Sequence, residues 1–179
     1  MQVRMAREDD AVQIAAIYRP SVTDGATSFE VQPPEAPEMA RRMRSVLAFA
    51  PWLVCADDDG PDRGDRVLGY AYASPHNERP AYQWSVNVTV YVHAAHHRRG
   101  VGRTLYETLF RLLRLQGFYL AHAGITLPNA GSVGLHQALG FRPVGVYPSV
   151  GWKLGGWRDV GWWQLELSPG AEGPPAEPR

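Results

Sequence analysis

The sequence predicts a single domain that contains both α-helices and β-strands, and three observations support this prediction. Its 179 residues fit one hydrophobic core. Hydrophobic residues make up 45% of the chain and charged residues 20%, a balance typical of folded globular proteins. Segments with the two-residue alternation of a strand are interspersed with segments that have the three- and four-residue spacing of a helix. We therefore expect one domain over residues 1–167 and a disordered tail over residues 168–179, where Pro, Gly, Ala and Glu dominate.

The first third of the chain has the pattern of one strand followed by two helices. A short strand is expected over residues 3–5 and a helix over residues 9–18, which Pro20 is expected to end. A second helix is expected over residues 34–49, behind a start rich in Pro and Glu. Its apolar residues recur at steps of three and four: Met39, Met43, Val46 and Leu47.

The middle of the chain predicts a β-hairpin, a long strand and a long helix. Residues 52–56 and 67–73 have strand patterns, and the intervening residues 57–66 are rich in Asp and Gly and predict the turn. Residues 84–93 alternate strictly between apolar and other side chains, the clearest strand signal in the sequence. Residues 102–116 carry a stripe of leucines at helical spacing and precede a glycine, the usual helix stop.

The last third predicts shorter elements. Residues 118–126 form another apolar run, and residues 132–139 predict a short helix. Final strands are expected over residues 141–147 and 162–167.

Charge and cysteine usage restrict the class of partner. Lys plus Arg and Asp plus Glu each number 18, so no global field favours nucleic acid or a membrane surface. The single cysteine, Cys55, cannot form an internal disulfide and fits a reducing compartment. The chain has no apolar signal segment and no run of about 18 apolar residues. We expect a cytoplasmic protein without nucleic-acid or membrane partners.

The joint between the long strand and the long helix predicts a phosphate-binding turn. It has the sequence His-His-Arg-Arg-Gly-Val-Gly-Arg over residues 96–103. A helix N-terminus presents unpaired backbone N–H groups and the positive end of the helix dipole, and glycine lets a pyrophosphate approach closely. The alternative interpretation is an ordinary basic helix start with solvated arginines.

Four blocks of sequence carry a resemblance to a known family. They are Gly69-Tyr-Ala-Tyr-Ala-Ser-Pro75, Tyr82-Gln-Trp-Ser-Val86 with Thr89-Val-Tyr-Val-His93, the Arg-Arg-Gly-Val-Gly-Arg turn, and Leu127-Pro-Asn-Ala-Gly-Ser-Val-Gly-Leu-His-Gln-Ala-Leu-Gly-Phe141. On these blocks the chain resembles the GNAT acetyltransferases, and within them the phosphinothricin and methionine sulfoximine or sulfone N-acetyltransferases. The similarity extends along nearly the whole chain except residues 57–66 and the tail.

The resemblance implies a fold and an activity. The fold would be mixed α/β, with a central, mostly antiparallel sheet that is flanked by helices and splays open where acetyl-CoA binds. The activity would be transfer of acetyl from acetyl-CoA to the amino group of a small amino-acid-like acceptor, by direct attack in a ternary complex. A homodimer and no metal are expected. Cys55 is the only thiol and lies in a predicted buried strand, so an acyl-enzyme is not expected.

The resemblance also implies residues for the cofactor. Backbone groups of Val90, Tyr91 and Val92 would hold the pantetheine arm and the thioester carbonyl. The pyrophosphate would lie against Arg98, Arg99, Gly100, Val101, Gly102 and Arg103. Asn129 matches the position that binds the CoA arm, although an N-cap or Asx-turn explains this residue equally well.

His136 matches the position of the group that protonates the departing thiolate. Ser132 lies four residues earlier, on the same helical face, and would point with His136 toward the thioester. The alternative is a structural histidine, the more common role of a lone helical histidine.

The acceptor in this branch is a zwitterion, for which a guanidinium offers planar, multidonor binding. Arg79 is the first candidate, with an exposed loop charge as the alternative. Further residues are expected to line the same pocket: Tyr72, Ser74, Asn77, Glu78, Tyr82 and Thr89.

Asn87 departs from the pattern, because related sequences carry there a glutamate that takes the ammonium proton. Asparagine can hydrogen-bond an amine but cannot accept its proton at neutral pH. Four titratable residues could substitute and are not ranked by the sequence: Glu30, His76, Glu78 and His93.

This departure keeps alternatives open: a catalytically weak acyl-CoA-binding or sensing protein, or an acetyltransferase for a different amine. Acetylation of protein N-termini or polyamines ranks lowest, because it requires an acidic groove and the sequence has no acidic cluster.

Overall fold

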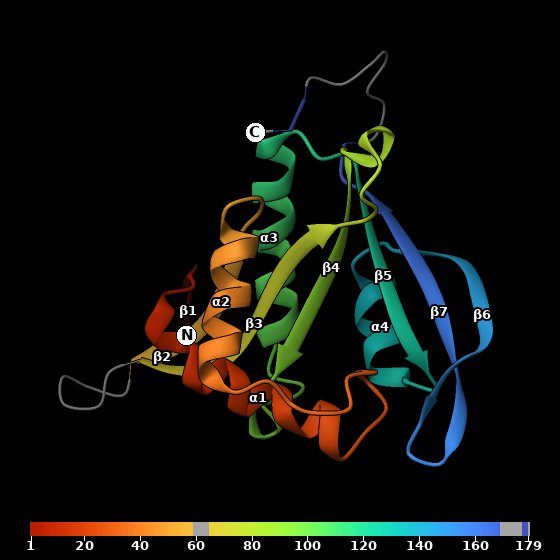
Figure 1. The fold of residues 1–179 in the computed structure, drawn as a ribbon. Coiled ribbons are helices and arrows are strands. Elements are labelled where there is room, and N and C mark those ends of the chain that lie inside the picture. Colours follow the sequence, from red (N-terminus) through yellow and green to blue (C-terminus); the bar gives the residue numbers. More distant parts are fainter. Residues whose placement is uncertain (59–64, 169–176, 179) are drawn as a thin grey trace. The chain divides into compact units, whose positions relative to one another are not determined.

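The computed structural model describes residues 1–58, 65–168 and 177–178, and its contacts divide the chain into two compact units. The first unit comprises residues 1–20, 33–74 and 89–112, and the second comprises the remainder. Figure 1 labels the helices and strands. The middle of the predicted turn and most of the predicted disordered tail lie outside the described residues.

The first unit is built on an antiparallel meander with helices α1 (Ala11–Thr23) and α2 (Ala36–Leu47). Strands β1 (Gln2–Met5), β2 (Trp52–Asp58) and β3 (Asp65–Pro75) pair in that order. The predicted hairpin is therefore confirmed. Its strands are two to four residues longer than the apolar runs, because pairing continues into the polar residues on both sides of the turn.

The strand β4 (Ser85–Val92) contributes to both units, its first half to the second and its last four residues to the first. In the first unit, the amide of His93 donates to the carbonyl of Leu68 over 2.8 Å. A Cβ placed on Gly69 would lie only 2.8 Å from the carbonyl oxygen of Tyr91. The end of β4 therefore lies directly against β3, at a position that only glycine fits without displacement.

The second unit holds the strand order β4-β5-β7-β6, together with helix α4 (Ala130–Ala138). Strands β5 (Leu120–Leu127) and β7 (Gly156–Glu166) pair antiparallel along the whole of β5. The parallel pairing of β4 with β5 covers only three residue pairs and ends at Asn87 and His122. A sheet whose strands splay apart midway is expected to show such an early end of pairing. The pairings of β1 with β2, β2 with β3, β5 with β7 and β6 with β7 are antiparallel and that of β4 with β5 is parallel, so the mixed, mostly antiparallel fold class is confirmed.

Helix α3 (Val101–Gln116) follows β4 at the predicted place. It begins in the first unit with a buried Val101, and Leu105, Leu109 and Leu113 of its leucine stripe are fully buried. No helix among the described residues is long and apolar enough to cross a membrane.

Two further differences from the predicted boundaries are larger. Pro20 does not end α1 but lies inside it, and the helix continues to Thr23. Proline removes one backbone donor and clashes with one carbonyl, a local cost that packing of the buried Val22 on the next turn can offset.

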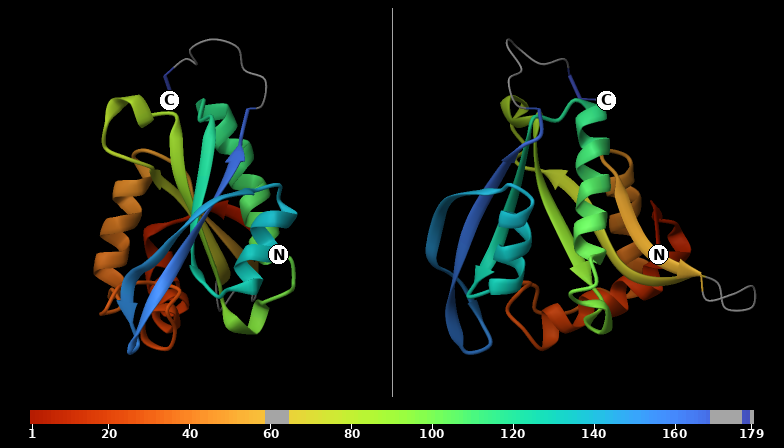
Figure 2. Two further views of the ribbon diagram at one scale, coloured as in Figure 1. Left: turned by 90° about the vertical axis from the view of Figure 1, so that its right-hand side faces the viewer. Right: turned by 180° about the vertical axis from the view of Figure 1, so that it is seen from behind.

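The second difference is the length of the last hairpin, which the ribbon views show as an extended pair (Figure 2). β6 (Arg142–Lys153) and β7 continue to a two-residue turn at Leu154 and Gly155, whose φ angles are 49° and 71°. Positive φ at both central residues fits a tight hairpin turn. The sequence pattern missed this extension because β6 is almost wholly exposed and so lacks the alternation of a half-buried strand.

A buried ion pair ties β1 to the residues before α1. The Arg4 guanidinium donates to both carboxylate oxygens of Asp10, over 2.8 and 2.9 Å, and to Asp65 over 2.9 Å. Asp10 is 5% exposed and also accepts the Arg7 amide. Burial alone would raise the pKa of Asp10, but the hydrogen bonds from Arg4 and Arg7 outweigh it and the pKa is lowered.

We expect Asp10→Asn to lower the free energy of unfolding by about 3 kcal/mol, because it leaves the largely buried Arg4 guanidinium with Asp65 as its remaining carboxylate partner. Since the folded pKa of Asp10 is lowered, its stabilisation is complete above the unfolded value of about 3.9 and is lost as the pH falls through the folded value. Urea titrations at pH 7 and pH 3 measure both effects.

The matched control is Asp9→Asn on the neighbouring exposed residue, which should change stability by less than about 0.5 kcal/mol. Equal losses of stability in the two variants would contradict the role assigned to the Asp10 ion pair.

The single domain predicted over residues 1–167 stays a prediction. Coincident unfolding curves from tryptophan fluorescence and circular dichroism in the same titrations test it.

Candidate active site

The predicted phosphate turn lies between β4 and α3 in the first unit. After the short 3-10 helix Ala94–His96, Arg98 and Gly100 have φ angles of 59° and 83°. The carbonyl of Gly100 accepts the amide and the hydroxyl of Thr104, over 3.0 and 3.1 Å, and so starts the helix. The ring of His97 hydrogen-bonds the carbonyl of Val92 over 2.9 Å.

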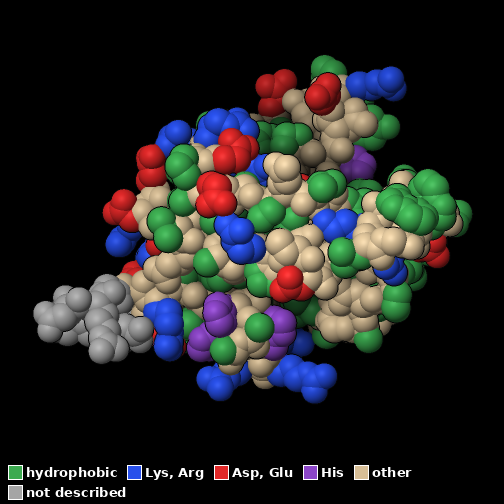
Figure 3. Space-filling model, turned by 60° about the horizontal axis from the view of Figure 1, so that its bottom comes forward, with side chains coloured by type: hydrophobic (Ala, Val, Ile, Leu, Met, Phe, Trp, Pro, Cys, Tyr) green, Lys and Arg blue, Asp and Glu red, His purple; other side chains and the backbone are tan. Residues whose placement is uncertain are grey.

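The turn leads directly into the N-terminus of a sixteen-residue helix, whose first N–H groups have no partner within the helix, as an anion site requires. The side chains of Arg98, Arg99 and Arg103 are exposed and add positive charge. Figure 3 shows a face on which histidine and Lys or Arg side chains gather. In the sequence, residues 93–103 bring together three of the six histidines with three arginines.

The three β4 residues assigned to acetyl-CoA are positioned from the β3 side. Gly69 allows β3 to approach, since its Cβ would also lie 3.0 Å from Val101 and 3.2 Å from the Cα of Val92. The ring of Tyr91 packs between Tyr18 and Tyr70, with ring centres 4.9 and 5.5 Å away. The Tyr91 side chain therefore anchors the strand, and Val90 and Val92 are half-buried beside it.

Three of the predicted acceptor residues also lie in the first unit. Tyr72 stacks on Trp52 at a ring distance of 4.1 Å, which fixes the plane of its ring. Ser74 and Thr89 are half-buried on β3 and β4. Nearby, complete burial raises the pKa of Tyr106, and the neighbouring Tyr72 raises it further, so its phenol stays protonated.

The start of α4, in the second unit, brings together three predicted residues. Asn129 is the N-cap, and its side-chain oxygen accepts the amide of Ser132 over 3.0 Å. Asn129 therefore makes the N-cap hydrogen bond that the alternative interpretation of this residue predicted. Nδ1 of His136 lies 2.8 Å from the Ser132 carbonyl and 3.4 Å from its hydroxyl.

His136 is held in one orientation. It is 3% exposed and meets the ring of Phe141 edge-on at 5.0 Å. Burial lowers its pKa, and the hydrogen bond to the Ser132 carbonyl opposes this only in part. Because a carbonyl only accepts, Nδ1 must carry the hydrogen, and any exchange of a proton takes place at Nε2.

Asn87 lies in a cluster of histidines in the second unit. Its side-chain oxygen is 2.9 Å from Nδ1 of His76, and its amide nitrogen donates to the Pro75 carbonyl over 3.3 Å. His122, the cross-strand neighbour of Asn87, stacks on His76 at a ring distance of 4.2 Å. Asn87 and His76 were predicted from the sequence and His122 was not, because its only signal is a histidine within an apolar run.

The remaining predicted acceptor residues form the loop before β4. Arg79 caps the short 3-10 helix Pro80–Tyr82, its amide donates to the side chain of Asn77 over 3.2 Å, and its own side chain is exposed. Glu78 is exposed, and the ring of Tyr82 lies 5.8 Å from that of His76.

The four candidate bases lie in different places. Only His76 contacts Asn87. The backbone carbonyl of Glu30 accepts the Lys153 ammonium, and the ring of the exposed His93 accepts the Ala95 amide in the first unit. Glu78 lies on the exposed loop two residues after His76.

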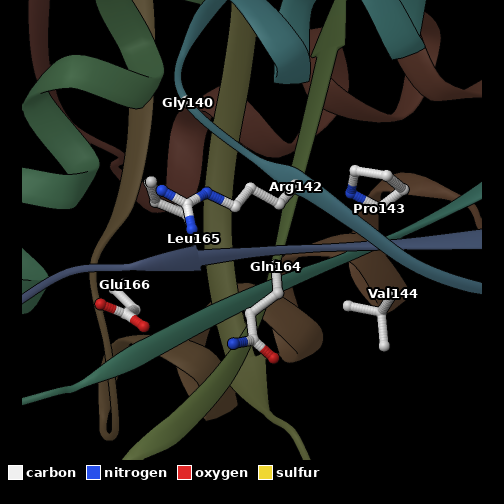
Figure 4. Close-up of a pocket in the computed structure, with 7 residues that line it drawn as sticks. All are labelled: Gly140, Arg142, Pro143, Val144, Gln164, Leu165 and Glu166. Carbon is white, nitrogen blue, oxygen red and sulfur yellow. The ribbon is translucent and has the colours of Figure 1, made fainter.

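A cavity of about 490 Å³ lies against the paired strands β6 and β7 (Figure 4), beside the register shift between Pro143 and Gly145. It is lined by Gly140, Arg142, Pro143, Val144, Gln164, Leu165 and Glu166. None of the predicted site residues lines it, although Gln164 lies 3.3 Å from Nε2 of His122. No group of three or more His, Cys, Asp or Glu residues in the described part of the chain could hold a metal ion.

Known proteins resemble this chain along nearly its whole length. It is similar to phosphinothricin N-acetyltransferase from Streptomyces viridochromogenes, with 36% identity over 178 residues, which cover 99% of this chain and 94% of that protein. It is also similar to the L-methionine sulfoximine/L-methionine sulfone acetyltransferase of Salmonella typhimurium, with 32% identity over 169 residues, 93% of this chain and 95% of that protein.

A solved structure gives the same picture. The phosphinothricin acetyltransferase of the GNAT superfamily from Sinorhizobium meliloti, in complex with AcCoA, superposes with a TM-score of 0.90 at 34% identity, over 98% of this chain and 93% of that one. The family model for the acetyltransferase (GNAT) family matches residues 20–141. With a family model over most of its length and relatives that match it almost end to end, the chain belongs to the GNAT acetyltransferase family.

Proposed function

We propose that this acetyltransferase moves the acetyl group of acetyl-CoA to the amino group of a small amino-acid-like acceptor of the phosphinothricin or methionine sulfoximine type. The observation that carries the proposal is the end-to-end similarity to enzymes named for these acceptors, together with a matching structure in complex with AcCoA. The turn at residues 98–103 leads into a helix N-terminus, and the loop over residues 76–84, the acceptor loop, carries the exposed guanidinium of Arg79.

For the cofactor, we assign main-chain groups of Val90, Tyr91 and Val92 to the pantetheine arm and the thioester carbonyl. Residues 98–103 hold the pyrophosphate through backbone N–H groups and arginine side chains. Asn129 and Ser132 contact the CoA arm. Backbone donors suit this reaction, because negative charge builds on the thioester oxygen in the transition state.

For the acceptor, Arg79 binds the carboxylate, and Tyr72, Ser74, Asn77, Glu78, Tyr82 and Thr89 line the pocket. The exposed Arg79 side chain, on a backbone fixed by Asn77, is suited to a mobile ligand that arrives from solvent.

The amine attacks acetyl-CoA directly, without an acyl-enzyme. Cys55 is the only thiol in the chain and is 0% exposed. Burial raises the pKa of its thiol, with a smaller contribution from Asp57, so the nucleophilic thiolate is disfavoured. A lone reduced thiol also fits the cytoplasm, where we place the enzyme.

His136 delivers the proton that the departing thiolate takes up. With Nδ1–H donated to Ser132 and a lowered pKa, the resting ring is neutral at pH 7. It therefore acts as a shuttle, in which Nε2 takes a proton from the tetrahedral nitrogen and delivers it to sulfur.

The enzyme is a homodimer through the exposed face of the β6–β7 hairpin. Large apolar side chains are exposed along the two strands of this hairpin: Val144, Val146, Tyr147, Val150, Trp152 and Trp157, which are 51–63% exposed. Patches of this kind mark interaction surfaces in soluble proteins.

Incubation of the protein with acetyl-CoA should release CoA thiol only when an acceptor such as phosphinothricin or methionine sulfoximine is present. The Arg79→Gln variant should lose about tenfold in kcat/KM for these amino acids, and much less for the corresponding amides, which lack the carboxylate. Tight CoA binding without acceptor-dependent thiol release would identify a sensing protein instead.

Gly69→Ala should raise the dissociation constant of acetyl-CoA at least tenfold, about 1.4 kcal/mol, because the new methyl group displaces the backbones of Tyr91 and Val92. Titration calorimetry measures the change. Gly145→Ala is the control, since nothing lies within 4 Å of its Cβ position. An unchanged dissociation constant in folded Gly69→Ala would refute the placement of the cofactor on β4.

Light scattering should give the mass of two chains for the wild-type protein and of one chain for Val146→Asp, because a charge in a buried interface is unfavourable. Val31→Asp, on an exposed valine outside the hairpin, should stay dimeric. A monomeric wild-type protein excludes the dimer.

A further inference from the structure

At the position where the family resemblance implies a glutamate, this chain has Asn87, which cannot take a proton. The structure places a titratable side chain directly against it, since Nδ1 of His76 lies 2.9 Å from the Asn87 side-chain oxygen. His76 is half-buried and begins the loop that carries Arg79 and Tyr82, and its amide donates to the Ser85 carbonyl over 3.2 Å. The imidazole is thus anchored at the first residue of the proposed acceptor loop.

Hydrogen bonds fix which nitrogen of His76 is basic. The Pro75 carbonyl can only accept, so the Asn87 amide nitrogen must face it and the Asn87 oxygen must face His76. An amide oxygen also only accepts, so Nδ1 of His76 carries the hydrogen. The basic nitrogen of the neutral ring is therefore Nε2, and Asn87 is the residue that sets this tautomer.

Other rings of the second unit pack around the imidazole of His76. Among the described residues, the titratable rings against it are those of His122, stacked at 4.2 Å, and of Tyr82, at 5.8 Å, and the Trp162 ring lies perpendicular to it with 6.2 Å between ring centres. Burial lowers the pKa of His122, and the adjacent His76 lowers it further. His122 is therefore disfavoured as the group that takes up the ammonium proton.

We propose that His76 is the base that accepts the ammonium proton of the acceptor, with Asn87 as the positioning residue that directs Nε2 toward it. The inference rests on the proposed function and names the residue that performs a step of it. One ammonium proton passes to Nε2 and on to water. The amine lone pair attacks the thioester carbon, the C–N bond forms, the C–S bond breaks, and a second nitrogen proton ends on the CoA sulfur.

His76→Gln tests this directly, because glutamine keeps a polar side chain of similar length but takes up no proton. The variant should lose about 100-fold in kcat/KM for the acceptor at pH 7. The loss should shrink as the pH rises past the pKa of the free amine, since the acceptor is then already neutral. The acidic limb of the pH profile should move to that higher pKa, and the dissociation constant of acetyl-CoA should stay the same.

The double variant His76→Gln/Asn87→Glu is the matched rescue, because it moves the base from one partner of the hydrogen bond to the other. It should recover at least about tenfold of the lost kcat/KM. A His76→Gln enzyme with the wild-type rate and acidic limb would overturn the proposal, and so would a loss that is uniform across pH and not rescued at residue 87.

Failure of the proposed function is distinguishable from failure of this inference. A wild-type chain that binds acetyl-CoA but releases no thiol with any acceptor would overturn both. An active wild-type enzyme whose pH profile is unchanged by His76→Gln would overturn only the inference.

Discussion

The short pairing of β4 is the constraint on which the proposed site depends. Main-chain groups of a strand can bind a ligand only where a neighbouring strand does not use them. The register of β4 with β5 ends at Asn87, before the residues assigned to acetyl-CoA. In the first unit, Gly69 lets β3 support those residues from one side. One strand thereby carries a side-chain site in its first half and a main-chain site in its second.

Most of the fold could be predicted from local pattern, because buried strands and helices impose a period on apolar residues. The long strand and the helix after it were predicted to within one residue at all four of their ends. The pattern failed where burial is absent, as along β6, and where packing overrides local preference, as at Pro20 inside α1. The pairing that brings His122 next to Asn87 joins residues 35 apart in the sequence, and no local pattern contains it.

The phosphate-binding part of the candidate site could be predicted more completely from the sequence than the acid and base residues could. The turn at residues 98–103 has a local sequence signature, since a strand, a glycine turn and a helix start are contiguous. The acid and base chemistry depends on hydrogen-bond partners that only the fold supplies. The sequence left Glu30, His76, Glu78 and His93 unranked, and the structure separates them by a single contact, that of His76 with Asn87.

The bulges in the last hairpin have a consequence for how the protein behaves in a crowded solution. β6 is the edge strand of its unit, and such an edge can recruit strands from other molecules. Register shifts at Pro143 and again between Tyr147 and Gly151 interrupt its ladder, and Pro143 and Pro148 lack the N–H that an incoming strand needs. Runaway fibre-like growth along this edge is therefore discouraged, while its side chains stay available for a finite, closed assembly.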